Sequence, residues 1–288
     1  MFSLLVDNIH INFTIGYDGL KMKHYKKISL FLLFIFACQS NTNGVPDHIY
    51  PKPNADIKYQ KDWQKDFYVK RIKIFKEDPI GFDKIVLLGN SITEDANDWN
   101  DRFSSTNISN RGISGDITDG ILERLDEIIY FKPLGIFLLI GINDIYAMNL
   151  PEGEQTENYI SENIIEILER LRNEIPKTKL YLQTILPTHR EDIVDQINRI
   201  NSSIINNAQP EVTIIDLHSI FANENGLMTE EYSTDGVHLN TYGYDIWTDH
   251  IRRHISKFLA KRPVVLEPDT TELNIDSTTV EPDTTALF

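Results

Sequence analysis

Five short apolar runs, separated by segments with helical periodicity, occupy the middle of the chain and restrict its fold more than any other feature. Four are typical of strands buried on both faces, and a fifth is weaker because polar residues interrupt it. The four are residues 85–88, 134–140, 180–186 and 212–217, and the weaker one is residues 107–113. Consecutive strands with single helices between them form right-handed crossovers. We therefore expect a three-layered α/β domain with a five-stranded parallel sheet and helices on both faces.

The segments between the runs carry apolar residues at helical spacing. Three such faces consist of Ile117, Ile121, Leu122, Leu125, Ile128 and Ile129; of Ile160, Ile164, Leu168, Leu171 and Ile175; and of Ile193, Ile197, Ile200, Ile204 and Ile205. Another helix precedes the first strand, and its side with Trp63, Phe67, Ile72 and Phe75 is predicted to pack on the core. In such sheets ligands bind beyond the carboxyl ends of the strands, so the functional residues are expected there.

Charge and cysteine content exclude several classes of function. The formal net charge of −15 argues against DNA or RNA binding, because neutralising phosphates requires clustered Lys and Arg. Hydrophobic residues make up 41% of the chain, which is enough for a sizeable core. The single cysteine, Cys38, excludes an intramolecular disulfide and a Cys-rich zinc site. Any chemistry must therefore use other side chains.

The amino-terminal segment is typical of an export signal. Residues 22–38 contain a basic stretch followed by a short apolar run, which is too short to span a bilayer. The segment ends in Ala37 and Cys38, and it resembles the lipobox of bacterial lipoproteins, in which the cysteine is lipidated. We expect residues 1–21 to belong to an overextended reading frame and the protein to be lipid-anchored in a bacterial cell envelope. An uncleaved membrane anchor with an incidental cysteine is the alternative.

Two further segments are predicted to lie outside the folded domain. Residues 39–55 are rich in Asn and Pro and poor in apolar residues, which is typical of a tether. Residues 263–288 are acidic and rich in Pro and Thr, and the sequence Glu-Pro-Asp-Thr-Thr occurs twice in them. Such a composition cannot bury enough apolar surface to offset chain entropy, so this tail is expected to be disordered. The folded domain is accordingly assigned to residues 56–262.

Two polar segments follow the first two predicted strands. Ser91 lies at the turn from the first strand into a helix, where its hydroxyl is exposed and its backbone N–H is free. Gly115 lies in the segment 110–116 after the second strand, where the absence of a Cβ lets a backbone N–H approach a ligand. Asp116 is predicted to cap the following helix. Each segment alone is also compatible with an ordinary turn.

Two more segments complete the set. Asn143 follows the third strand in a Gly-x-Asn-Asp sequence, and its amide can donate to a developing oxyanion. Asp235 precedes His238 by three residues, so its carboxylate can reach Nδ1 across a tight turn and leave Nε2 free as a base. An accidental pairing of one acid with one of eight histidines is common. The order of serine, glycine, asparagine and Asp-x-x-His along the chain makes coincidence a poor explanation.

These four segments resemble the blocks of the SGNH hydrolases, also called GDSL-type esterases, over roughly residues 84–258. The stretch 110–118, the Gly-x-Asn-Asp at 141–144 and the stretch 235–240 are similar to the branch with platelet-activating-factor acetylhydrolases and sugar acetylesterases. The resemblance implies a five-stranded parallel sheet of flavodoxin-like order. It also implies Ser91 as nucleophile, His238 as base, Asp235 as its orienting acid, and an oxyanion hole formed by Ser91, Gly115 and Asn143. Asn90 departs from the aspartate usual before the serine.

The same residues suffice for ester hydrolysis. A serine needs an adjacent base to become nucleophilic, and the remaining groups can stabilise an oxyanion, so no metal or organic cofactor is required. We predict a serine esterase acting on short-chain, especially acetyl, esters of carbohydrates, with an oligomeric state that the sequence leaves open. A flavodoxin-like sugar- or phosphate-binding module is the first alternative, and it predicts that Ser91 and His238 lie far apart. An inactive lipid-anchored scaffold is the second.

Four other conspicuous residues are given structural roles. His189 is interpreted as a loop residue after the fourth strand, and His218 as a residue that ends the fifth strand. Trp99 and Trp247 are predicted to lie in the core.

Overall fold

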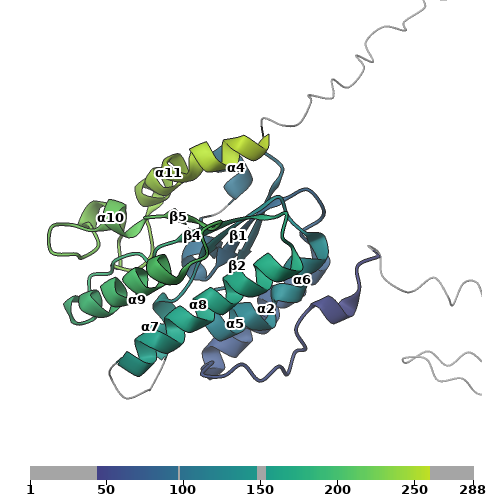
Figure 1. Ribbon diagram of the computed structural model, residues 1–288, viewed down its shortest axis with the longest axis horizontal. Helices are drawn as coiled ribbons and strands as arrows, with labels where there is room; N and C mark the ends of the chain where they lie inside the picture. The colour runs from purple at the N-terminus through teal and green to yellow at the C-terminus, as the bar shows by residue number, and fades with distance from the viewer. Residues whose placement is uncertain (1–43, 97, 148–153, 260–288) are drawn as a thin grey trace, which may run out of the picture. The chain divides into compact units, whose positions relative to one another are not determined.

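A five-stranded parallel sheet forms the centre of the domain, with strand order β2-β1-β3-β4-β5 (Figure 1). The computed structural model describes residues 44–96, 98–147 and 154–259. The strands are β1 (Ile85–Gly89), β2 (Ile108–Gly112), β3 (Gly135–Leu139), β4 (Lys179–Gln183) and β5 (Thr213–Ile215). This is the flavodoxin-like order, so the predicted α/β class and the strand count are confirmed. The last strand is shorter than the apolar run 212–217 that predicts it.

The central strands place the functional segments at one edge of the sheet. Every residue of β1 and of β3 is buried, because both strands have neighbours on either side and helices over both faces. The register pairs Gly89 at the end of β1 with Gly112 on β2 and with Leu139 on β3. The three strands therefore end level, and the segments that follow them begin side by side.

Helices cover both faces of the sheet (Figure 1). Helix α11 packs with α4 on one face, and α8 packs with α5, α6 and α9 on the other. The longer helices are α2 (Asp62–Glu77), α8 (Glu154–Glu174), α9 (Val194–Asn207) and α11 (Thr241–Leu259). The shorter ones are α3 (Ser91–Glu94), α4 (Trp99–Phe103), α5 (Thr118–Glu123), α6 (Leu125–Phe131), α7 (Ile142–Ala147) and α10 (His218–Phe221), with 3-10 turns η1 (Asp47–Ile49), η2 (Glu191–Ile193) and η3 (Glu230–Tyr232).

The helical predictions hold with two corrections. The periodic segment 117–129 forms two helices, α5 and α6, which meet at the buried residue Arg124. In α2 only Ile72 and Phe75 of the predicted apolar side are buried, whereas Trp63 and Phe67 are 50% and 49% exposed. The amino-terminal half of α2 therefore presents aromatic side chains to solvent, contrary to the predicted packing of that whole side on the core.

The folded domain begins earlier than predicted. Ile49, Tyr50 and Ile57 are buried, and the Tyr50 hydroxyl donates to the carbonyl oxygen of Phe75 at 3.3 Å. The second half of the predicted tether 39–55 is therefore part of the domain. Its composition misled the prediction because a few anchoring apolar residues are enough to order a polar segment.

Several predictions concern residues outside the described part of the chain. The reading-frame extension, the export signal with Cys38 and the acidic tail all lie there. In the stretches for which helices are defined, none is long and apolar enough to cross a membrane.

Candidate active site

Ser91 lies where β1 turns into α3, as the sequence predicts. The side-chain oxygen of Asn90 accepts a hydrogen bond from the Ile92 N–H at 3.0 Å, which is the contact of a helix N-cap. The Asn90 carbonyl accepts from the N–H groups of Thr93 and Glu94. The departure from aspartate at position 90 therefore preserves the cap, and Ser91 is the first residue of the helix that follows.

The structure brings Ser91 and His238 together across 147 residues of sequence. The distance from Ser91 Oγ to His238 Nε2 is 2.9 Å. On the other side of the imidazole, His238 Nδ1 lies 2.7 Å from Asp235 Oδ2. The three side chains thus form one hydrogen-bonded chain from hydroxyl to carboxylate.

The loop between η3 and α11 fixes the Asp235–His238 pair. Asp235 Oδ1 accepts from the backbone N–H groups of Val237 at 2.9 Å and His238 at 2.8 Å, while the Ser233 hydroxyl donates to the His238 carbonyl at 2.6 Å. Partial burial opposes ionisation of Asp235, but the hydrogen bonds from His238 and the two N–H groups outweigh it and hold its pKa at about 2. The carboxylate is therefore charged at neutral pH.

The backbone N–H groups of Ser91 and Gly115 have no acceptor in the part of the chain that the structure describes. Gly115 has a φ of +79°, in the left-handed region. The loop with Gly115 is tied to α3, because Glu94 Oε2 accepts from the Ser114 N–H at 2.6 Å and from its hydroxyl at 2.8 Å. Free N–H groups in a loop held this way are suited to an anionic oxygen.

Asn143, the third predicted oxyanion donor, also reaches this loop. Its Nδ2 donates to the Asp116 carbonyl at 3.0 Å. This contact uses one of the two amide hydrogens and fixes the plane of the amide, so that the second hydrogen keeps a defined direction. The predicted glycine and asparagine therefore lie on adjoining segments, at the ends of β2 and β3.

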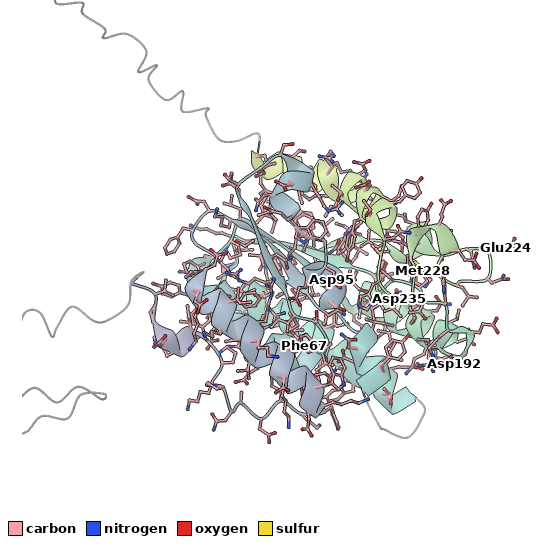
Figure 2. The ribbon with its side chains drawn as sticks, turned by 180° about the vertical axis from the view of Figure 1, so that it is seen from behind. Phe67, Asp95, Asp192, Glu224, Met228 and Asp235 are labelled. Carbon is pink, nitrogen blue, oxygen red and sulfur yellow. The ribbon has the colours of Figure 1, made fainter. Side chains whose placement is uncertain are left out.

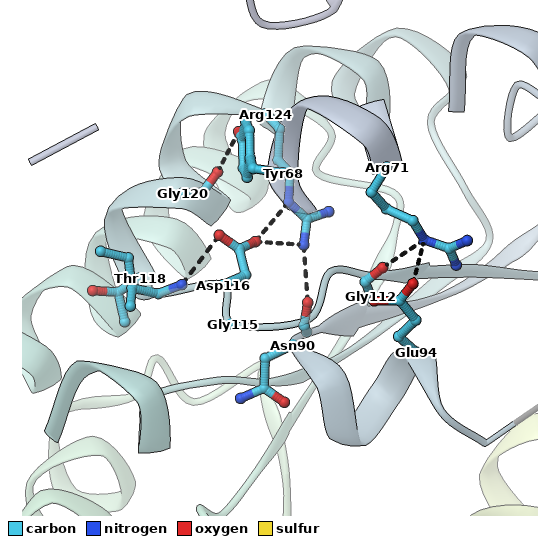
Figure 3. A network of polar contacts seen from close by, with 12 residues as sticks. Tyr68, Arg71, Asn90, Glu94, Gly112, Gly115, Asp116, Thr118, Gly120 and Arg124 are labelled. Atoms are coloured by element: carbon cyan, nitrogen blue, oxygen red, sulfur yellow. Dashed lines mark hydrogen bonds and ion pairs between the residues drawn. The ribbon is translucent and has the colours of Figure 1, made fainter. Parts of the chain in front are cut away.

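A buried ion pair lies beside Asn90 and the loop of Gly115 (Figure 3). Arg124 Nη2 lies 2.9 Å from Asp116 Oδ2, and the side chains are 3% and 0% exposed. The same Nη2 donates to the Gly89 carbonyl at 3.0 Å, at the end of the strand that leads to Ser91. Burial raises the pKa of Asp116 to about 6, although Arg124 favours its charged form. The pair therefore links the strand behind Ser91 to the loop of Gly115.

Asp116 does not cap the following helix as predicted. Its Oδ1 accepts from the Ile117 N–H at 3.1 Å, but α5 begins at Thr118, whose N–H donates to Asp144 Oδ1 at 3.0 Å. The Thr118 hydroxyl donates to the same Asp144 oxygen at 2.5 Å. The cap thus comes from another segment, because the Asp116 side chain is taken by Arg124.

Sequence reasoning also missed the contribution of α2. A Cβ placed on Gly115 would lie 2.6 Å from Cζ3 of Trp63, so the indole ring rests on the glycine backbone. Gln64 Nε2 donates to the Gly115 carbonyl at 2.7 Å. Figure 2 shows Phe67 of α2 on the same side of the domain as Asp95 and Asp235. The available signal was the aromatic composition of the start of α2, which the prediction assigned to the core.

The remaining conspicuous residues take structural positions. His189 is a loop residue, as predicted, and its N–H donates to the Gly236 carbonyl at 2.9 Å beside the Asp235–His238 turn. His218 begins α10, three residues after β5 ends at Ile215. Trp99 and Trp247 are buried, and their rings pack edge to face with centroids 4.9 Å apart, which confirms their core assignment.

The chain resembles known hydrolases over most of this domain. Residues 87–246 match the model of the GDSL-like lipase/acylhydrolase family. A bovine platelet-activating factor acetylhydrolase IB subunit alpha1 is 22% identical over 170 residues, which cover 56% of this chain and 70% of that protein.

Solved structures show the same fold. A Streptococcus pneumonia protein, provisionally named a platelet activating factor, is 26% identical with a TM-score of 0.57, and the match covers 67% of this chain and 92% of that one. A GDSL-like lipase from Bacteroides thetaiotaomicron is 24% identical with a TM-score of 0.54, covering 66% and 97%.

Proposed function

This chain belongs to the GDSL-like lipase/acylhydrolase family and is a carboxylic ester hydrolase, and from this we propose that it cleaves short-chain esters, acetyl esters of carbohydrates in particular, with a Ser91-His238-Asp235 triad. The observation that carries the proposal is the continuous chain of hydrogen bonds, 2.9 Å from Ser91 Oγ to His238 Nε2 and 2.7 Å from His238 Nδ1 to Asp235. A ligand-binding module without turnover would not need this alignment, and its expectation that Ser91 and His238 lie far apart is contradicted by the first distance.

The first half of the proposed reaction acylates Ser91. His238 Nε2 takes the hydroxyl proton while Oγ attacks the ester carbonyl carbon, and the carbonyl electron pair moves onto its oxygen. The N–H groups of Ser91 and Gly115 and the amide of Asn143 stabilise that oxyanion. When the intermediate collapses, the bond to the alcohol oxygen breaks and His238 returns the proton to the leaving alcohol.

The second half releases the acid. A water molecule gives its proton to His238 Nε2 and attacks the acyl carbon, and the new oxyanion collapses with the proton returned to Ser91 Oγ. Asp235 keeps its charge throughout and orients the imidazole, consistent with its pKa of about 2. Every proton in this scheme moves between side chains of the triad, the ester and water.

The first prediction tests this assignment. Ser91→Ala removes the nucleophile and should lower kcat on p-nitrophenyl acetate by at least about a thousandfold. The control is Ser202→Ala, an exposed serine whose hydroxyl bonds only within its own helix, and it should keep wild-type activity. Circular dichroism of both variants checks that the fold is intact. Wild-type turnover by folded Ser91→Ala protein would refute the triad.

We also propose that Cys38 carries a lipid and holds the protein in a bacterial cell envelope. The support is the basic and apolar pattern of residues 22–38, which ends at the only cysteine. Cys38→Ser should move the protein from the membrane pellet to the soluble fraction of the producing cell. An unchanged pellet fraction would favour an uncleaved anchor instead.

A further inference from the structure

One aromatic side chain of α2, Trp63, borders the loop that carries Gly115, and a second, Phe67, lies beside Trp63. Trp63 and Phe67 are 50% and 49% exposed, and their rings meet edge to face with centroids 6.2 Å apart. Tryptophan is highly buried on average, so an exposed indole next to a reactive centre calls for an explanation. We propose, on the basis of the esterase function above, that Trp63 and Phe67 form a subsite on which the uncharged sugar ring of an acetylated carbohydrate stacks.

The position of Trp63 ties it to the reaction centre. The edge of its indole ring fills the place that a Cβ of Gly115 would occupy, with Cζ3 at 2.6 Å and Cη2 at 2.7 Å from that point. The ring therefore lies against the α-carbon that is bonded to the Gly115 nitrogen, and the proposal places one arm of an ester held by that N–H beside the ring. Because Trp63 is half exposed, that arm can pack on it.

The start of α2 is held in place, so the indole is a preformed surface. Gln64, adjacent to Trp63, is buried and donates from Nε2 to the Gly115 carbonyl at 2.7 Å. Its other side-chain atom, Oε1, accepts from the Lys61 N–H at 2.6 Å. A preformed aromatic platform binds a ring at low entropic cost. It also gives a large dispersion contact with the C–H face of a pyranose, whose hydroxyls stay in water.

The charges around the two rings favour a neutral ligand. Lys70 Nζ lies 5.8 Å from the centroid of the Phe67 ring, where a cationic ligand would otherwise bind. The first turns of α2 carry Asp62, Lys65, Asp66 and Lys70, so neither sign of charge dominates there. Lys65 lies 3.5 Å from Asp62, and Lys61 Nζ, before the helix, donates to the Tyr146 carbonyl. A quaternary ammonium would meet lysines, and an anionic headgroup would meet no cluster of free positive charge among these residues. A sugar ring meets neither penalty.

The experiment compares substrates that differ in one arm of the ester. Trp63→Ala and Phe67→Ala are assayed by pH-stat on acetylated methyl β-xyloside and on ethyl acetate, which has no ring to stack. The ratio of kcat/KM for the sugar acetate to that for ethyl acetate should fall about tenfold in Trp63→Ala and less in Phe67→Ala. Trp63→Phe should restore part of the ratio, because it returns an aromatic face.

A matched control and two further substrates make the test decisive. Phe82→Ala removes another aromatic side chain, which is 64% exposed. Phe82 precedes β1 and so lies at the end of the sheet away from Ser91, and the kcat/KM ratio of this variant should equal that of the wild type.

An equal loss on both acetates in Trp63→Ala would show a structural role and overturn the proposal. A larger loss on ethyl hexanoate or on acetylcholine would overturn it in favour of an acyl or a cation subsite. Wild-type protein that cleaves ethyl acetate but not the sugar acetate would also overturn it, whereas turnover of ethyl acetate by Ser91→Ala would instead refute the triad.

Discussion

At the scale of single residues, Asp144 is the carboxylate whose environment most affects the pH dependence of stability. Its side chain is fully buried, and burial raises its pKa to about 7, although the Thr118 hydroxyl and N–H favour the charged form. The unfolded chain has an aspartate pKa of about 3.9. Between these values the folded protein holds a proton that the unfolded chain has lost, so this contribution is complete below about pH 3.9 and is lost as the pH rises towards 7.

The second prediction follows from that sign. Relative to its value at pH 5, the free energy of unfolding at pH 8 should be higher in Asp144→Asn than in wild type, because the amide does not titrate and still offers an oxygen to the Thr118 N–H. His218, His250 and His254, whose pKa values are lowered by burial, favour the folded state at the higher pH and do so in both proteins. Urea unfolding measures the difference between the two pH values. Asp116 titrates in the same direction as Asp144, so part of the pH dependence should remain in the variant. Asp62→Asn, an exposed carboxylate, serves as control, and an unchanged difference in Asp144→Asn would contradict the assignment.

The sequence predicts contacts between residues that are near in the chain better than contacts between residues that are far apart in it. Asp235 and His238 are three residues apart, and a tight turn is enough to pair them, so their contact follows from spacing. Ser91 and His238 meet only through the sheet, and their pairing was inferred from the resemblance to a family. The partner of Thr118, Asp144, is 26 residues away, and no local pattern indicates such a cap.

At the scale of helices and strands, the Asp116–Arg124 pair joins the end of β1 to the start of the α5–α6 segment. The break between these helices places Arg124 inside the domain, where it bonds both Asp116 and the Gly89 carbonyl. A continuous helix was predicted because apolar periodicity runs through the break. Periodicity does not register a buried arginine that replaces an apolar residue on the inner face.

The third prediction separates the structural from the positioning effect of this pair. Arg124→Met leaves a buried carboxylate without its partner and should lower stability by about 3–5 kcal/mol. Adding Asp116→Leu should recover most of that loss, since an apolar pair of similar volume packs in the same space. We expect kcat of the double variant to stay roughly ten- to a hundredfold below wild type, because the strand end behind Ser91 has lost its donor to Gly89. Urea unfolding and kcat on p-nitrophenyl acetate give the two readouts, and wild-type kcat in a stable double variant would show that the pair only stabilises the fold.

Helix α2 shows a different limit of sequence patterns. The helix itself was predicted correctly, but its buried face consists of Gln64, Tyr68, Ile72 and Phe75. Trp63 and Phe67 lie on the exposed side, because Trp63 is nine residues, or about two and a half turns, from Ile72. The Trp63 ring lies against Gly115 instead of the core. Apolar periodicity gives the direction in which side chains point and does not tell whether protein or ligand occupies that side.

At the scale of the whole molecule, the folded domain extends beyond the segment that matches the family model. That match begins at residue 87, whereas α2 supplies hydrogen bonds from Gln64, Tyr68 and Arg71 to the segment that runs from the end of β2 into α5. Their acceptors are the carbonyl oxygens of Gly115, Gly120 and Gly112, respectively. The pattern of the alternating α/β region predicts the sheet well. The polar composition of residues 39–55, however, led to a predicted domain start at residue 56, whereas Tyr50 is already buried and bonded to the Phe75 carbonyl.

The fourth prediction tests the contribution of these preceding segments to the domain. A chain that begins at residue 44 keeps every described contact of η1 and α2, and we expect wild-type stability and wild-type kcat on p-nitrophenyl acetate. A chain that begins at residue 58 loses the buried side chains of Ile49, Tyr50 and Ile57, each worth roughly 1.5–3 kcal/mol when fully buried, and should remain active with a lower urea midpoint. A chain that begins at residue 79 also loses α2, which leaves the carbonyls of Gly112, Gly115 and Gly120 without these side-chain donors, and should be inactive or unfolded. Full activity of the shortest chain would show that the family segment alone builds the site, and that the contacts of α2 with the Gly115 loop are dispensable.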